Sequence, residues 1–114
     1  MKILLVEDEG IIVLGLRMEL ESAGLNCAVA ATGVSAIKSA REFIPDVVLI
    51  DINLGSGMDG IECAGEIRNI CSPRIIFMTG YVDNELRERA SIMRPVGYLV
   101  KPVDISDIQS LLDI

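Results

Sequence analysis

Short apolar runs alternate along this chain with stretches that repeat with the period of an α-helix. The runs are continuous, as expected for strands that are covered on both faces of a sheet. Five strands are predicted, at Ile3–Val6, Cys27–Ala31, Val47–Ile50, Ile75–Met78 and Gly97–Val100. Each is followed by a predicted helix, at Glu9–Ala23, Thr32–Phe43, Gly60–Ile70, Asp83–Met93 and Ile105–Leu112. This alternation predicts an α/β fold, with a parallel sheet and helices on both of its faces.

Two of the predicted helices show contrasting apolar patterns. The first is richly apolar, with an aliphatic residue at every fourth position and others beside it: Ile12, Leu16 and Leu20, flanked by Ile11, Leu14 and Met18. Gly24 follows it, at the position where a glycine commonly ends a helix. The fourth helix has only a thin apolar stripe among many charges, formed by Leu86, Ala90 and Met93.

Composition excludes several classes of partner. The net charge is -7 and the pI is about 4.4, so neither direct nucleic-acid binding nor binding to an anionic membrane is expected. The length of 114 residues favours one domain, and we expect 1–114 to form a single domain with no output domain. The start of the chain does not resemble a signal peptide, and no apolar run approaches the roughly 18 residues of a membrane span. A cytoplasmic location is therefore expected.

The three cysteines, Cys27, Cys63 and Cys71, show no CxxC spacing, and the chain has no histidine. This pattern predicts reduced and mostly buried thiols, and it makes a zinc site improbable. Without a histidine to act as base, serine or cysteine hydrolase chemistry is also unsupported.

Chemically active residues follow four of the five predicted strands. Glu7 and Asp8 follow the first strand, Asp51 the third, Thr79 the fourth and Lys101 the fifth. In open α/β sheets, ligands bind at the carboxyl ends of the strands, so these side chains should meet at one edge. The sequence therefore predicts a site with three carboxylates, a hydroxyl and an ammonium group.

This set of groups suits phosphoryl transfer. Crowded carboxylates repel one another, and Mg²⁺, which prefers hard oxygen ligands, would offset their charge. A carboxylate can act as a nucleophile and form an acyl phosphate. Magnesium, Lys101 and the Thr79 hydroxyl would each neutralise one oxygen of the transferring group. Gly80, next to Thr79, leaves room for a donor to approach.

Each of these residues also has an ordinary structural explanation when taken alone. Glu7 and Asp8 could simply begin a helix, where acidic side chains favour the dipole. Thr79 suits a strand, and Lys101 could be a solvated charge. Tyr98 alone predicts half-buried packing with its hydroxyl in water. The joint placement at four strand ends, rather than any single residue, favours the functional interpretation.

The same segments resemble the receiver domains of two-component response regulators. The matching pieces run through the whole chain: Ile3-Leu4-Leu5-Val6-Glu7-Asp8-Glu9, Val48-Leu49-Ile50-Asp51-Ile52-Asn53-Leu54, Met58-Asp59-Gly60, Phe77-Met78-Thr79-Gly80 and Gly97-Tyr98-Leu99-Val100-Lys101-Pro102. The resemblance implies a flavodoxin-like, doubly wound, five-stranded parallel sheet of order 2-1-3-4-5 with five helices. It also implies a signalling switch of a phosphorelay rather than an enzyme.

The resemblance assigns Asp51 as the phosphoacceptor and implies a magnesium cofactor. Asp8, Asp51 and the backbone carbonyl of Asn53 would bind the ion directly, and Glu7 would act mainly through a bound water. The phosphoryl group would come from a sensor histidine kinase or a phosphotransfer protein. The signal would pass to a downstream protein target or a fused output domain.

The resemblance also implies how the phosphoryl group is read. Lys101 would contact it, Thr79 beside Gly80 would move toward it, and Tyr98 would swing inward. The Lys101–Pro102 bond would be cis. The usual signalling surface is the fourth helix, fifth strand and fifth helix. Its charges are mixed, which would allow a symmetric homodimer: Asp83, Glu85, Arg87, Glu88, Arg89 and Arg94.

Two features depart from the commonest receiver pattern. The loop after Asp51 is one residue longer and has Gly55 where many receivers have proline. Tyr81 lies two residues after Thr79, and we hypothesise that it screens the site from water and slows the loss of the phosphoryl group.

Three other functions fit the residues less well than a receiver does. An aspartate-nucleophile phosphatase would carry a second acid where this chain has Asn53, which cannot titrate. A flavin-binding electron carrier needs a phosphate-binding loop after the first strand, but Glu7, Asp8 and Glu9 lie there and repel phosphate. A purely structural interaction module remains the third alternative.

Overall fold

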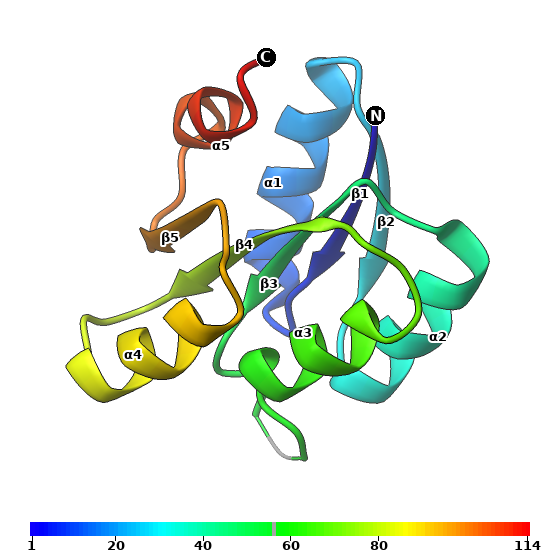
Figure 1. Ribbon diagram of the computed structural model, residues 1–114. Coiled ribbons are helices and arrows are strands. Elements are labelled where there is room, and N and C mark those ends of the chain that lie inside the picture. Colours follow the sequence, from blue (N-terminus) through cyan, green and yellow to red (C-terminus); the bar gives the residue numbers. More distant parts are fainter. Residues whose placement is uncertain (56) are drawn as a thin grey trace.

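A computed structural model describes residues 1–55 and 57–114, in which a central sheet lies between two layers of helices (Figure 1). The sheet has five parallel strands in the order β2-β1-β3-β4-β5. Their bounds are β1 Lys2–Val6, β2 Asn26–Ala30, β3 Val47–Asp51, β4 Arg74–Thr79 and β5 Gly97–Val100. The predicted flavodoxin-like strand order is confirmed.

Five helices connect and follow the strands. Their bounds are α1 Gly10–Ser22, α2 Gly33–Phe43, α3 Gly60–Arg68, α4 Asn84–Ile92 and α5 Ile105–Leu112. α1 and α5 cover one face of the sheet, while α2, α3 and α4 lie on the other side (Figure 1). Every predicted element is present, with its ends within two residues of the predicted ones. None of the described helices is long and apolar enough to cross a membrane.

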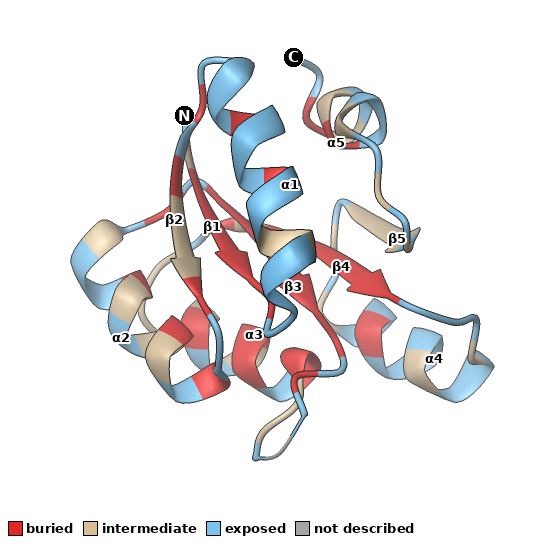
Figure 2. Cartoon of the chain, turned by 180° about the vertical axis from the view of Figure 1, so that it is seen from behind, coloured by how far each residue is buried: buried red, intermediate tan, exposed pale blue. Residues whose placement is uncertain are grey.

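The apolar strand residues alternate between two core clusters, one on each face of the sheet. The cluster toward α2, α3 and α4 contains Leu4, Val6, Val48, Ile50, Ile75 and Phe77 from the strands. The cluster toward α1 and α5 contains Ile3, Leu5, Val47, Leu49, Ile76 and Met78. Because successive side chains of a strand point to opposite faces, continuous apolar runs fill both layers. Figure 2 shows these central strands as mostly buried.

Helix α1 contacts the sheet through only part of its apolar surface. Leu16 and Leu20 are buried, as their spacing predicted. In contrast, Ile11, Leu14 and Met18 are exposed (90%, 63% and 62%, respectively). These three residues, which flank the stripe in the sequence, lie outside the buried face, because a helix 13 residues long can turn only one side to the sheet.

Local capping defines where several helices begin. Asp59 caps α3: its side chain accepts a hydrogen bond from the Glu62 amide, and the Glu62 side chain accepts one from the Asp59 amide. Gly24, just beyond α1, has a φ of 84°, the left-handed conformation expected of a glycine that ends a helix.

All three cysteines are free thiols, with Cys27 and Cys63 buried as predicted.

Candidate functional site

The strand ends bring the predicted site residues together at one edge of the sheet. Asp51 is the last residue of β3, and Thr79 is the last residue of β4. Glu7 directly follows β1, and its amide donates to the Ala30 carbonyl, which extends the pairing with β2. Glu7, Asp51 and Thr79 are 1%, 2% and 0% exposed, so two carboxylates lie almost out of water.

Lys101 binds both of the buried carboxylates. Its Nζ lies 2.9 Å from Asp51 Oδ2, and 3.0 and 3.1 Å from the two oxygens of Glu7. The Lys101 amide donates to the Thr79 carbonyl at 2.7 Å, which fixes the residue beside the end of β4. Along the chain, Lys101 is 94 positions from Glu7 and 50 positions from Asp51, and the fold makes the three residues neighbours.

The loop that follows Asp51 wraps around its carboxylate. The Asn53 amide donates to Asp51 Oδ1 at 3.0 Å, so both carboxylate oxygens accept a hydrogen bond. Further along, a Cβ at Gly55 would lie 3.2 Å from Asp8 Oδ2, so this glycine brings the loop close to Asp8. Gly60 begins α3 against the backbone of Asp51, where any side chain would collide with the Asp51 carbonyl oxygen. Ser56, which the predicted loop included, lies outside the described residues.

Four acidic residues offer oxygen ligands within 4.8 Å of one another: Glu7, Asp8, Glu9 and Asp51. The donor set consists of hard oxygens, of which Asp8 and Glu9 are exposed and reachable from solvent. It therefore fits a divalent cation such as Mg²⁺, which needs few protein ligands and keeps several waters. Sequence reasoning did not assign Glu9, although it is the third acid in a row after β1. Its carboxylate lies 3.9 Å from Lys101 Nζ.

Crowding changes the proton affinity of two groups in the site. Burial, together with the neighbouring Asp51, raises the pKa of Glu7 from 4.5 to about 7, although Lys101 opposes the shift. Burial alone would lower the pKa of Lys101, but its hydrogen bonds to Asp51 and Glu7 outweigh this and raise that pKa. Lys101 is thus held in its charged form between the two buried carboxylates.

Among the described residues, neither the Thr79 hydroxyl nor the Tyr98 hydroxyl forms a hydrogen bond with Asp51. The Thr79 hydroxyl donates to the Tyr81 carbonyl at 3.0 Å, within its own turn. The Tyr98 hydroxyl is buried and has no hydrogen-bond partner among the described residues. The expectation drawn from Tyr98 alone, a hydroxyl in water, is therefore wrong. Its ring packs against the core cluster of α2, α3 and α4, and the guanidinium of Arg87 lies 5.2 Å from the ring centroid.

Two further expectations concern the backbone at Lys101 and the space at Gly80. The Lys101–Pro102 peptide bond is cis, as the resemblance implied. Gly80 is exposed, and apart from its chain neighbours no atom of the described residues lies within 4 Å of where its Cβ would be, so this position leaves room as predicted.

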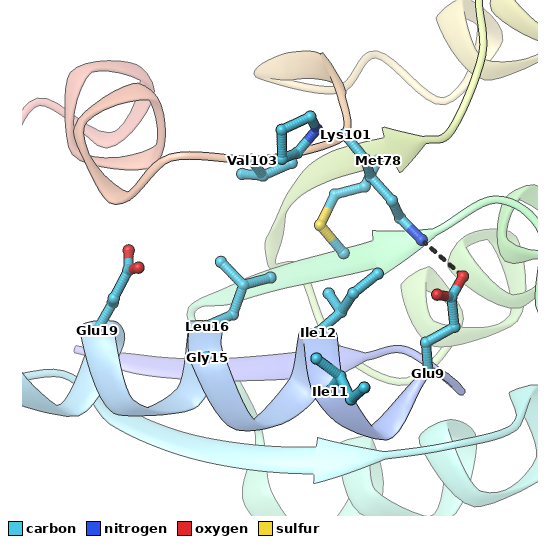
Figure 3. A pocket seen from close by; sticks show the side chains of 10 residues that line it. Glu9, Ile11, Ile12, Gly15, Leu16, Glu19, Met78, Lys101 and Val103 are labelled. Carbon is cyan, nitrogen blue, oxygen red and sulfur yellow. Dashed lines mark ion pairs between the residues drawn. The ribbon is translucent and has the colours of Figure 1, made fainter.

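A groove runs from the site along α1 (Figure 3). It has a volume of about 480 Å³ and a largely apolar lining, with Glu9 and Lys101 at the end nearest the site: Glu9, Ile11, Ile12, Gly15, Leu16, Glu19, Met78, Lys101, Pro102 and Val103. Glu9 and Glu19 lie near opposite ends of the labelled stretch of α1 in Figure 3. The exposed Ile11 thus borders a concave apolar surface rather than standing alone.

Comparison with known proteins places this fold and site in one class. Residues 3–113 match the response regulator receiver domain family. The chain belongs to this family, whose members are the receiver domains of two-component signalling systems. Among curated relatives, it is 33% identical over 108 residues to the transcriptional regulatory protein PdtaR of Mycobacterium tuberculosis, covering 94% of this chain. It spans about half the length of that relative (52%).

Other similar proteins match the chain over more of their own length. Sporulation initiation phosphotransferase F of Bacillus subtilis is 31% identical over 109 residues, which cover 95% of this chain and 87% of that protein. The receiver domain of a modulated diguanylate cyclase from Desulfovibrio desulfuricans G20 superimposes with a TM-score of 0.91 at 35% identity, covering 98% of this chain and 90% of that one. A CheY-like receiver from Methanospirillum hungatei JF-1 gives a TM-score of 0.90 at 25% identity, covering 98% and 90%, respectively.

Proposed function

We propose that this receiver accepts a phosphoryl group on Asp51 from a phosphohistidine of a partner kinase or phosphotransfer protein. An Asp51 carboxylate oxygen attacks phosphorus, the P–N bond of the donor breaks, and the imidazole leaves with the bonding electron pair. The product is an acyl phosphate on Asp51. These 114 residues contain no histidine, so the phosphohistidine of the donor lies outside them.

The observation that carries this proposal is the contact between Lys101 Nζ and Asp51 Oδ2, 2.9 Å apart, at an almost fully buried strand end. A buried ammonium beside a carboxylate nucleophile can move to an oxygen of the incoming phosphoryl group as charge develops there. Gly80 directly follows β4 at the same edge of the sheet, and a Cβ there would meet no atom of the described residues beyond its chain neighbours within 4 Å.

Asp8 and Asp51, with the Asn53 carbonyl, would hold Mg²⁺ directly, and Glu7 would act through a water. A bound magnesium ion would supply charge neutralisation for the transferring phosphoryl group. Lys101, held by Glu7 and Asp51, would pair with a phosphoryl oxygen. Thr79 would give up its bond to the Tyr81 carbonyl in order to donate to the phosphoryl group.

The direct test is an intact-mass spectrum after incubation with a small acyl-phosphate donor and Mg²⁺. We expect one phosphoryl adduct on the wild type and none on Asp51→Asn. Asp46→Asn is the matched control, because Asp46 lies just before the other end of β3 and is exposed. An adduct on Asp51→Asn, or no adduct on the wild type with either acyl phosphate or partner kinases, would leave a phosphorylation-independent interaction module as the better description.

Magnesium binding is tested separately by thermal unfolding. A ligand that binds only the folded state raises its stability, so Mg²⁺ should raise the Tm of the wild type. Asp8→Asn should remove most of that rise, whereas Asp104→Asn, an acid outside the site, should not. Equal Tm rises in wild type and Asp8→Asn would contradict the assignment of Asp8.

The groove along α1 supports docking of the donor protein beside Asp51. An apolar surface that adjoins the reactive edge would orient the phosphohistidine, and Ile11 is its most exposed apolar residue. Ile11→Asp should slow transfer from a phosphorylated donor protein without changing the reaction with a small acyl phosphate. Val34→Asp, an exposed apolar residue of α2, is the control. Equal slowing with both donors would contradict docking at this groove.

The output surface is proposed to be α4, β5 and α5. Its mixed charges would support a homodimer on phosphorylation, in which acidic and basic side chains pair across a two-fold axis. Light scattering of the protein with a beryllofluoride phosphoryl mimic should then show a doubled mass. A monomeric mass under these conditions would leave a different downstream protein as the partner of this surface.

A further inference from the structure

A second cavity, on a different part of the molecule, is lined by two arginines. It lies between α4 and the segment that enters β5, has a volume of about 300 Å³, and is lined by Arg87, Ser91, Arg94, Pro95, Gly97 and Tyr98. No acidic residue is among these six. In a chain with a net charge of -7 and only 10 lysines and arginines, this placement of two of them around one cavity is notable.

Neither arginine is engaged by a carboxylate. Among the residues that the structure describes, Arg17 pairs with Glu21 and Arg89 pairs with Asp59, but Arg87 and Arg94 form no ion pair. The guanidinium of Arg87 rests over the ring of Tyr98 at 5.2 Å, which fixes its position without using its N–H donors. These donors therefore remain available to an oxyanion in the cavity.

Arg94 occupies a position that favours glycine. It follows Met93, the C-terminal cap of α4, and has a φ of 50°, in the left-handed region. A side chain there raises the energy of the folded backbone by about 1 kcal/mol relative to glycine. Ile44 and Asp113 have the same conformation at the ends of α2 and α5, so at Arg94 it reflects how α4 ends. The Arg94 carbonyl accepts a hydrogen bond from Arg68 at 3.4 Å, which brings a third guanidinium close to the segment.

The surrounding charges favour a small anion over an extended acidic surface. Glu88 lines a neighbouring cavity together with Arg87 and Ser91, so it lies close to the rim. Asp83 is occupied at the start of α4, where it accepts from the Glu85 and Leu86 amides. A large acidic partner would meet these carboxylates, whereas a compact oxyanion can lie between two guanidiniums, which match phosphate geometry.

We propose that this cavity binds a small phosphate-bearing molecule, with the phosphate held between Arg87 and Arg94. The cavity is larger than one phosphate group, so it leaves room for an organic remainder beside Pro95 and Gly97. Tyr98 forms the wall beneath Arg87, and its hydroxyl is buried. A ligand that holds Arg87 in place therefore also restrains Tyr98. The binding itself does not depend on Asp51 as phosphoacceptor.

The test is a titration with inorganic phosphate, and then with adenosine monophosphate against adenosine, followed by amide NMR spectra. EDTA is present throughout, so that the carboxylate edge at Asp51, without a cation, repels the anion. We expect saturable shifts of residues 87–98 with both phosphates and none with adenosine. Arg87→Gln and Arg94→Gln should each weaken binding about tenfold. Arg41→Gln, which removes the same charge from α2, should leave the affinity unchanged, as should Asp51→Asn.

Several results would overturn the proposal. Chloride at matched ionic strength could give the same shifts, which would indicate general screening. The two arginine variants could bind phosphate as the wild type does while keeping well-dispersed spectra. A poly-glutamate peptide could shift residues 87–98 where phosphate and adenosine monophosphate do not, which would assign the cavity to a protein partner. Phosphate-dependent shifts at residues 51–53 and 79–80 in place of residues 87–98, with tighter binding in Asp51→Asn, would place the phosphate at the carboxylate edge instead.

Discussion

The centre of the sheet and its β5 edge differ in how completely they are packed. All of β3 is buried, as are residues 3–6 of β1, whereas every residue of β5 is half-buried or exposed. The helices repeat the contrast: α3 buries five residues, and α4 buries only Ala90. Regions with few buried contacts open at lower free energy. Asp51 therefore lies on the rigid part of the molecule, while Tyr98 and α4 belong to the part that can move.

The largest expected difference between the two regions is in core stability. Leu49 of β3 is fully buried, and Leu99 of β5 is partly buried against the same cluster. We expect Leu49→Ala to lower the free energy of unfolding by about 3 to 4 kcal/mol, and Leu99→Ala by about 1 to 2 kcal/mol. Urea unfolding of the two variants measures both. Equal losses would show that the β5 edge is packed as firmly as the centre.

Asp59 joins the two regions, because it caps α3 and also pairs with Arg89 of α4. Burial alone would raise its pKa, but the Glu62 amide and the Arg89 guanidinium outweigh this and hold the pKa of Asp59 below its usual value. We expect Asp59→Ala to lower the free energy of unfolding by about 1 to 2 kcal/mol at pH 7. Asp59→Asn keeps the cap but loses the charge, so it should lose less.

The pH dependence separates these two contributions. A depressed carboxyl pKa gives stability that is present above the unfolded pKa and is lost as the pH falls through the folded one. The gap between wild type and Asp59→Asn should therefore be full at pH 7 and close as the pH drops below about 4. A gap that stays constant in urea titrations across this range would mean that the charge contributes nothing.

Tyr81 tests whether the exposed loop between β4 and α4 protects the site in the packed region. Its side chain is 53% exposed, and its carbonyl accepts from Thr79. Tyr81→Ala should lose the phosphoryl group of Asp51 a few-fold faster, a change of less than about 1 kcal/mol in barrier. Intact mass followed over time after removal of the donor measures the rate, with Val82→Ala as the control. Loss from the wild type that is as fast as from Tyr81→Ala, or faster, would remove the screening role.

The smallest expected effect on stability comes from breaking the exposed ion pair between Arg89 of α4 and Asp59, which caps α3. Arg89 lies 2.8 Å from Asp59, with 44% of its side chain exposed. Arg89→Ala should lower the free energy of unfolding by about 0.5 kcal/mol, and the difference should shrink in high salt. Arg17→Ala, which breaks a fully surface pair with Glu21, provides the comparison. A salt-independent loss would indicate that Arg89 packs rather than pairs.

The sequence predicts the central region better than the edge. Short, continuous apolar runs favour strands that are covered on both faces, so β1, β3 and β4 and the residues at their ends follow from the pattern. The carboxylates and Lys101 were predicted to meet, and they do. The spacing of Leu16 and Leu20 indicates the buried side of α1, but the 90% exposure of Ile11 does not follow from it, because the residues beside that stripe are apolar as well. The buried Tyr98 hydroxyl and the local bond of Thr79 depend on loop geometry that no residue pattern encodes.

The alternation of strand side chains between two layers has a further consequence. On β5, Tyr98 faces the layer of α2, α3 and α4, while its neighbour Leu99 faces that of α1 and α5. The groove that Lys101 borders therefore opens along α1, and the arginine cavity opens beside α4. For protein engineering, the sheet separates the two surfaces. Exchanging α4 and its loop with those of a relative should give a chimera that accepts phosphoryl groups from the same donor protein and binds a different downstream protein.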